Sequence, residues 1–247
     1  MKLRTRIWVS FLFDTLHRRN ITYLGDILGE AARIIKGDRK LQPEYGLKRP
    51  DQVKTAPDQG ERVPPGQFLS KSFPVLTYGS APKVDLETWS IRVFGLVEQE
   101  IELNWDQFTK LDWVTVTSDF HCVTQWSALD NTWEGVTVEH LLSLAKPKPE
   151  AKFIMAHCFG NYTTNLPLDL VLEEGLVVHK QDGEELGKDH GWPTRLIVPS
   201  RYAWKSAKWL NGIELMAEDV PGFWEQRGYN NNADPWKEER FWPELTK

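Results

Sequence analysis

Apolar and polar residues alternate through much of the chain after residue 68, a pattern typical of half-buried β-strands. The stretch "WSIRVFGLVEQEIELNWDQF" (89–108) alternates around a turn near 98–100 and predicts a β-hairpin. Further strands are predicted over 113–123, 151–160, 175–183, 194–200 and 207–217, the last with Gly212 as a break. Short helices are predicted over 104–111, 137–145 and 166–175. The pattern therefore favours an α+β fold with mixed sheets and short helices.

The first 63 residues differ from the rest. Apolar residues recur at a spacing near 3.6 within 5–37, which predicts helices, and 38–67 is rich in proline and charge, as an extended linker is. We expect a helical arm with a linker over 1–63 and one folded domain over 64–247. The basic arm either packs on its own domain or docks on a partner or an anionic membrane surface, and nothing in the sequence supports the membrane in particular.

Charge and cysteine content narrow the function classes. Residues 1–63 carry 13 Lys/Arg and 8 Asp/Glu, whereas 64–247 carry 17 and 27, so the body has a net charge of −10. Such an acidic body argues against nucleic-acid binding. Two cysteines form no disulfide framework, and no apolar run reaches the roughly 20 residues that span a bilayer. The sequence is read as cytoplasmic.

Few familiar catalytic motifs are present. The chain has no glycine-rich phosphate loop, no dinucleotide fingerprint, no HExxH and no GxSxG. Two His-Cys pairs, 121–122 and 157–158, lack zinc-site spacing, and a cysteine hydrolase built on Cys122 with His157 or His190 is weakly specified. In "DHGWPTRLIVPSRYAWKSAKWL" (189–210) basic and aromatic residues interleave. This segment either grips an anionic cofactor or forms a solvated basic turn.

Four ordered segments carry a resemblance to a known family. "PPGQFLSKSFPVLTYGSAP", "FHCVTQWS", "HGWPTRLIVPSRYAWKSAKW" and "PGFWEQRGYNNNADPW" together resemble the sulfite oxidase family of molybdenum enzymes, in its short bacterial type. The similarity covers about residues 62–242 and leaves 1–60 outside. It implies the molybdopterin-binding-domain fold of that family, with molybdenum and molybdopterin as cofactors.

The resemblance also implies roles for individual residues. Cys122 matches the metal ligand, and Trp126 would stand beside the reacting centre. Residues matching cofactor contacts are Tyr78, Gly79, Ser80, Cys158, His190, Arg195, Ser206 and Lys208. Among these, Arg195 should contact the phosphate region and His190 the pterin. Cys158 matches a cofactor contact rather than a second metal ligand.

One departure from the sulfite-oxidising members shapes the expected activity. Members that oxidise sulfite place arginines where this chain has Thr77-Tyr78-Gly79 and Gln125-Trp126-Ser127. A less cationic pocket suits oxygen-atom transfer on a small, neutral S- or N-oxide. Sulfite oxidation proper and a non-catalytic molybdopterin-binding protein remain the alternatives. The sequence shows no haem or flavin module, so electrons should pass to or from a separate haem, flavin or iron–sulfur protein.

Overall fold

The structure, a computed structural model, describes residues 62–242 of the 247. The expected helical arm and most of the linker lie outside the described residues. The strands and helices follow one another as β1 (Phe68–Leu69), β2 (Ser90–Gly95), β3 (Ile101–Asn104), α2 (Trp105–Phe108), β4 (Val114–His121), β5 (Trp126–Thr137), α3 (Val138–Ala145), β6 (Phe153–Cys158), β7 (Tyr162–Pro167), α4 (Leu168–Glu174), β8 (Leu176–Gln181), β9 (Glu184–Glu185), β10 (Arg195–Ile197) and β11 (Leu210–Met216). Single 3₁₀ turns form over Lys188–His190, Ala203–Lys205, Glu225–Arg227 and Pro235–Lys237.

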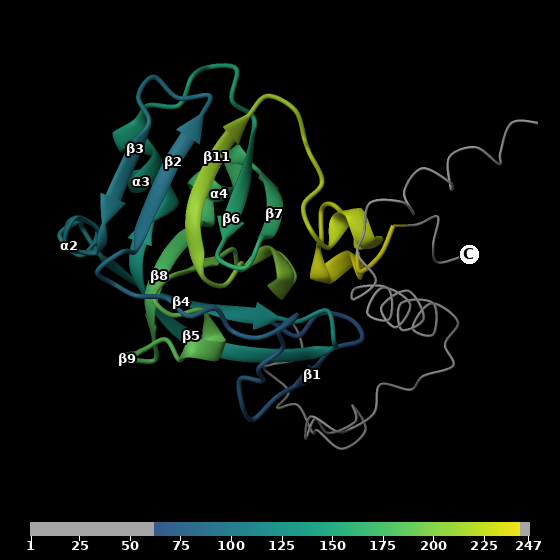
Figure 1. Ribbon diagram of the computed structural model, residues 1–247. Helices are drawn as coiled ribbons and strands as arrows, with labels where there is room; N and C mark the ends of the chain where they lie inside the picture. The colour runs from purple at the N-terminus through teal and green to yellow at the C-terminus, as the bar shows by residue number, and fades with distance from the viewer. Residues whose placement is uncertain (1–61, 243–247) are drawn as a thin grey trace, which may run out of the picture. The chain divides into compact units, whose positions relative to one another are not determined.

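Two mixed sheets form the body of the domain (Figure 1). One has six strands, in the order β1-β5-β8-β10, with β4 also paired to β5 and β9 to β8. The other has five strands in the order β3-β2-β11-β6-β7. Only the β1–β5 and β2–β11 pairings are parallel among those between named strands. The expected α+β class with mixed sheets and short helices is confirmed.

Two of the three short helices, α2 and α3, begin at a side-chain cap. Asn104 and Gln107 form a capping box at the start of α2, and the Thr137 hydroxyl accepts the His140 N–H at the start of α3. Helices α3 and α4 lie behind the five-stranded sheet in Figure 1. Their buried side chains share one apolar core with that sheet, which includes Leu141, Leu142, Val171, Ile91, Val93, Ile154 and Ile213. This core fixes the sheet from which the β6–β7 turn projects.

A second apolar core lies on the six-stranded sheet and reaches the candidate site. It contains Phe68, Phe120, Cys122, Trp126, Trp133, Val178 and Ile197 among its buried residues. A third, small cluster joins Tyr202, Trp204 and Ala233. Cys122 and Cys158 therefore belong to different cores, because Cys158 is buried with the five-stranded sheet.

Most predicted elements are present, but the strands β1, β5, β7 and β9 were not predicted and several boundaries moved. Strand β5 was not predicted because Asp130, at a φ of 58°, and two register shifts interrupt its alternation. Strand β7 was not predicted because it has only six residues, Tyr162–Pro167. Its last two residues lie within the range predicted for the following helix, so α4 begins at Leu168 rather than at 166. Gly212 does not break the last strand, since β11 runs through it with one register shift. Within 62–242, no helix is long and apolar enough to cross a membrane.

Candidate active site

One cavity of about 350 Å³ gathers residues from six parts of the chain, a volume in the range of small-molecule sites. The 73–82 segment, the turn after β4, the β6–β7 turn, the stretch 190–195, the stretch 203–209 and the C-terminal stretch 223–229 all contribute to its wall. Of the described residues that line it, none is Asp or Glu. The cavity thus has basic, aromatic and neutral polar walls.

Cys122 faces this cavity from a tight turn that ends β4. Its N–H donates to the Trp126 carbonyl at 2.8 Å, and Gln125, at a φ of 72°, reverses the chain between them. The Thr124 hydroxyl donates to Cys122 Sγ at 3.2 Å. Burial raises the pKa of the Cys122 thiol, so a thiolate here needs a bound cation beside it.

Arg195 places a buried cation on the wall. Its Nη1 and Nη2 donate to the carbonyls of His190 and Ser206, both at 3.0 Å, while its Nε has no acceptor among the described residues. Burial lowers the pKa of Arg195 to about 10, against the opposing effect of the two cysteines. Gly191, at a φ of 113°, lets the chain pass so close that a Cβ there would lie 3.0 Å from Arg195 Cβ.

Lys208 ties three segments of the wall together. Its Nζ donates to the Leu76 carbonyl at 2.8 Å, the Thr77 hydroxyl at 2.9 Å and the Asp189 carbonyl at 2.7 Å. Burial, followed by nearby Arg195, lowers the pKa of Lys208 to about 7. An anion bound beside this amine would favour its charged form.

His190 completes the basic side of the cavity. Burial, together with Arg195 and Lys208, lowers the pKa of His190 below its usual value. Its ring meets the edge of Phe73 at a centroid distance of 5.5 Å. The imidazole is therefore neutral at pH 7 and able to donate one hydrogen bond and accept another.

Aromatic side chains form the rest of the wall. Trp126 is 2% exposed, lies 5.3 Å from Phe73 between ring centroids, and has an Nε1 with no acceptor among the described residues. Farther along the wall lie Tyr78, Phe159, Tyr162, Trp204, Trp209, Phe223, Trp224 and Tyr229. Such rings offer apolar faces to a ligand without a net charge.

The donor set fits the cofactor implied by the sequence. A molybdopterin carries an anionic phosphate and hydrogen-bonding edges, and the wall offers two basic side chains, unpaired N–H donors at Arg195 and Trp126, and no carboxylate. A soft metal with open coordination suits the sulfur of Cys122, which lines the cavity. The residues of this cavity therefore fit the molybdenum–molybdopterin group.

The structure brings together most, but not all, of the residues selected from the sequence. Those lining the cavity are Tyr78, Ser80, Cys122, Trp126, His190, Arg195, Ser206 and Lys208. Gly79 lies between two lining residues with a φ of 75° and is itself absent from the wall. Cys158 lies in the core of the five-stranded sheet and does not line the cavity.

Sequence reasoning missed the aromatic contribution of the C-terminal segment. Phe223, Trp224 and Tyr229 reach the cavity wall. The available signal was the concentration of six tryptophans within 192–242, which by itself fits a core as well as a pocket.

Comparison with known proteins agrees with this site. The sequence profile of the oxidoreductase molybdopterin binding domain family matches residues 78–224. The uncharacterized oxidoreductase YuiH of Bacillus subtilis is 42% identical over 186 residues, which is 74% of this chain and 94% of YuiH. The putative protein-methionine-sulfoxide reductase subunit YedZ1 of Azospira oryzae is 26% identical, covering 70% of this chain and 68% of that protein. Both relatives share most of the domain described here.

Larger enzymes share it as one part of a longer chain. An NADPH nitrate reductase of Emericella nidulans is 28% identical over 72% of this chain and only 23% of its own length. The sulfane dehydrogenase SoxCD of Paracoccus pantotrophus has the same fold, with a TM-score of 0.56 at 17% identity over 76% of this chain and 60% of that one. Together with the cavity, these matches show that the chain belongs to the sulfite oxidase-like family of molybdopterin-binding oxidoreductases, whose cofactor is molybdenum–molybdopterin.

Proposed function

We propose that this protein transfers an oxygen atom on a small, neutral S- or N-oxide, with Cys122 as the protein ligand of molybdenum. The observation that carries the proposal is the position of Cys122. It lines a cavity in which basic groups and aromatic rings occur together and the described wall lacks carboxylates. When bound, the molybdenum centre supplies two-electron oxygen-atom transfer.

Arg195, His190, Ser206 and Lys208 would hold the organic part of the cofactor. The Arg195 guanidinium is anchored by two carbonyls, and its Nε–H has no acceptor among the described residues, so it would be available to a bound cofactor. We call the part of the cavity wall formed by these four side chains and by residues 76–77 the cofactor cradle. Lys208 joins residues 76–77 to residue 189, so the parts of the cradle cannot separate without breaking the hydrogen bonds of Lys208. These contacts make the basic groups part of the cofactor cradle rather than free anchors for a substrate anion.

The remaining wall favours a neutral substrate. Trp126 and Tyr78 lie in the two stretches, 125–127 and 77–79, in which the resemblance to sulfite-oxidising members leads us to expect arginines. Moving a sulfite dianion from water into an aromatic pocket without a free cation is costly. A sulfoxide or N-oxide instead presents apolar groups to the rings, and its oxygen leaves as water after two electrons and two protons are supplied.

Electrons for this reaction would come from a separate protein. Within 62–242, no group of three or more His, Cys, Asp or Glu side chains is placed to hold a further metal. The relative YedZ1 is itself described as a subunit, which is in keeping with a redox partner on another chain. We place the activity in the cytoplasm because both cysteines are free thiols, the form typical of a reducing compartment.

Metal analysis followed by a substrate panel tests the proposal. Protein purified from cells that make the cofactor should hold about one molybdenum atom per chain and should reduce dimethyl sulfoxide or trimethylamine N-oxide with a reduced viologen dye. Molybdenum X-ray absorption of Cys122→Ser should show one sulfur neighbour fewer than the wild type.

Other outcomes would replace the proposal. Turnover of sulfite alone would make the protein a sulfite oxidase, and bound metal without turnover of any panel member would make it a cofactor-binding protein. An unchanged sulfur count in Cys122→Ser would remove Cys122 as the ligand.

A further inference from the structure

Trp204 connects the cavity wall to a buried polar centre. Its indole lines the cavity, stacks on Tyr202 at a centroid distance of 5.4 Å, and meets Tyr229 edge-on at 5.1 Å. The Tyr162 hydroxyl also donates to the Trp204 carbonyl at 2.5 Å. The ring contacts restrict the tilt of the indole, but they leave its Nε1–H to be satisfied on the side away from solvent.

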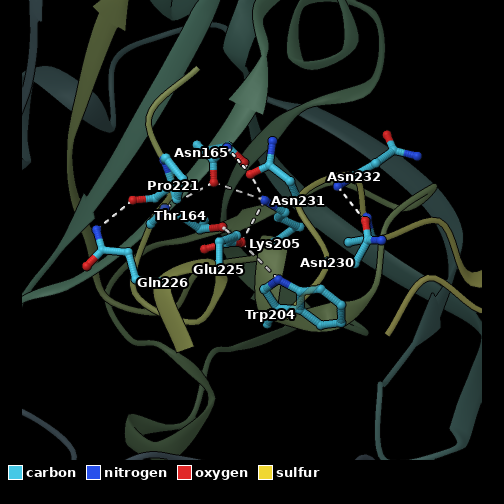
Figure 2. A network of polar contacts seen from close by, with 12 residues as sticks. Thr164, Asn165, Trp204, Lys205, Pro221, Glu225, Gln226, Asn230, Asn231 and Asn232 are labelled. Carbon is cyan, nitrogen blue, oxygen red and sulfur yellow. Dashed lines mark hydrogen bonds and ion pairs between the residues drawn. The ribbon is translucent and has the colours of Figure 1, made fainter. Parts of the chain in front are cut away.

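That N–H donates to Glu225, a carboxylate that is fully buried. Figure 2 shows Trp204, Lys205 and Glu225 gathered around one polar centre. Three donors converge on Glu225 Oε1, namely Trp204 Nε1 at 3.0 Å, Thr164 Oγ1 at 3.0 Å and Lys205 Nζ at 2.6 Å. The other oxygen, Oε2, has no partner among the described residues. One atom therefore fixes the direction of the indole N–H.

Lys205 offsets the cost of burying the Glu225 carboxylate by pairing with it. The side chains of Lys205 and Glu225 are both 0% exposed, and Lys205 Nζ also donates to the Asn165 carbonyl at 2.8 Å. Gly222 brings the C-terminal segment against β7, since a Cβ there would lie 2.6 Å from Thr164 Cα. The segment that contributes Phe223, Trp224 and Tyr229 to the cavity is thus anchored at the same point.

We propose that Glu225 is a positioning residue that fixes Trp204 as a wall of the substrate pocket and so sets which substrates fit. The inference rests on the proposed function for its choice of substrates. Without the acceptor at Oε1, the indole would turn to satisfy its N–H and would narrow or reshape the cavity. This change should raise the KM of bulky substrates more than that of small ones.

A pair of double variants separates the hydrogen bond from the buried charge. Lys205→Met with Glu225→Leu removes the acceptor, whereas Lys205→Met with Glu225→Gln keeps a carbonyl oxygen for Trp204. Both avoid an unpaired buried ion, and replacing buried ion pairs by residues of similar size often preserves folding. The Gln form is therefore the matched control for the Leu form.

Steady-state kinetics should split the two double variants. For methyl phenyl sulfoxide, the Leu form should show a KM raised by about tenfold over the Gln form with kcat nearly unchanged, which corresponds to about 1.4 kcal/mol. For dimethyl sulfoxide the two should agree within about threefold. Equal KM values for the larger sulfoxide in both forms would overturn the proposal.

Fluorine NMR tests the positioning role without turnover. Holoenzyme containing 5-fluorotryptophan gives a Trp204 resonance, identified by its loss in Trp204→Phe. That resonance should shift or broaden in the Leu form, remain near its wild-type position in the Gln form, and respond to the inert ligand methyl phenyl sulfone. A Trp204 resonance unchanged in the Leu form would refute the positioning role. If no sulfoxide is turned over while the resonance behaves as expected, the proposed function fails and the positioning role stands.

Discussion

The two His-Cys pairs of this chain end two strands in different sheets, and only one of them reaches the cavity. Cys122 follows β4 of the six-stranded sheet, and Cys158 is the last residue of β6 in the five-stranded sheet. Both thiols are free and 6% exposed. Burial alone therefore does not distinguish a candidate ligand from a core residue.

The backbone makes the difference. Cys158 remains in register with Leu210 on one side and Tyr162 on the other, so its side chain stays within the sheet's core. Cys122 lies one residue beyond its strand, in a turn closed by Trp126. Outside the ladder the side chain no longer follows the alternation of the strand, and Cys122 lines the cavity.

The histidine of the pair whose cysteine lines the cavity is buried, and the other histidine is partly exposed. His121 is buried, with its Nδ1 hydrogen-bonded to the Ser127 hydroxyl at 2.9 Å, whereas His157 is about one-third exposed and pairs with Glu214 at 2.9 Å. Neither imidazole lines the cavity. The His-Cys dipeptide is thus a coincidence of sequence rather than a repeated site.

Activity should give the largest contrast between the two cysteines. Cys122→Ser should lower turnover of dimethyl sulfoxide by about 10³-fold or more, because under the proposed function the metal would lose its protein ligand. Cys158→Ser should remain within about threefold of the wild type, since Cys158 does not line the cavity. Steady-state assays at matched molybdenum content check this. Comparable losses in both variants would mean that Cys158 also acts on the cofactor.

Removal of the cofactor should produce a smaller difference between the two cysteines, in the rate at which a thiol reagent modifies them. In cofactor-free protein, iodoacetamide should modify Cys122 at least about tenfold faster than Cys158, because only Cys122 faces a cavity. In the loaded protein Cys122 should be protected. Peptide mass spectrometry over time measures both rates, with denaturant present as the control for equal intrinsic reactivity. Equal rates in the folded, cofactor-free protein would contradict the assigned directions of the two side chains.

The smallest difference should be in stability at alkaline pH, and it comes from the tyrosine near each cysteine, Tyr229 near Cys122 and Tyr162 near Cys158. Burial raises the pKa of Tyr229 to about 12, and raises that of Tyr162 well above its usual value. The fold keeps the Tyr229 proton that the unfolded chain loses above pH 10, so stability falls as pH rises from about 10 to 12. Tyr229→Phe should remove up to about 2.7 kcal/mol of that fall.

Urea unfolding at pH 8, 10 and 12, with tyrosinate absorbance as a second signal, measures this contribution. A wild-type curve and a Tyr229→Phe curve of identical slope above pH 10 would show that the phenol titrates freely in the folded protein.

The helices and strands and the basic side of the cavity could be predicted, because each depends on residues that are close together in the sequence. Alternation and capping residues gave most strands and helices, and His190, Arg195, Ser206 and Lys208 lie within one short segment. The rest depends on contacts between distant residues. Strand β5 is stabilised by its partners despite Asp130, and no local pattern reveals that Glu225 meets Trp204.

The hydrogen bonds of Lys208 also bear on how the holoenzyme is assembled. Its Nζ joins residues 76 and 77 to residue 208 across about half the chain, so the cradle exists only after distant segments have met. No fragment ending before residue 208 contains that connection, so we expect cofactor loading to follow folding. A cofactor that binds only the folded state would then add to the free energy of unfolding of the finished protein.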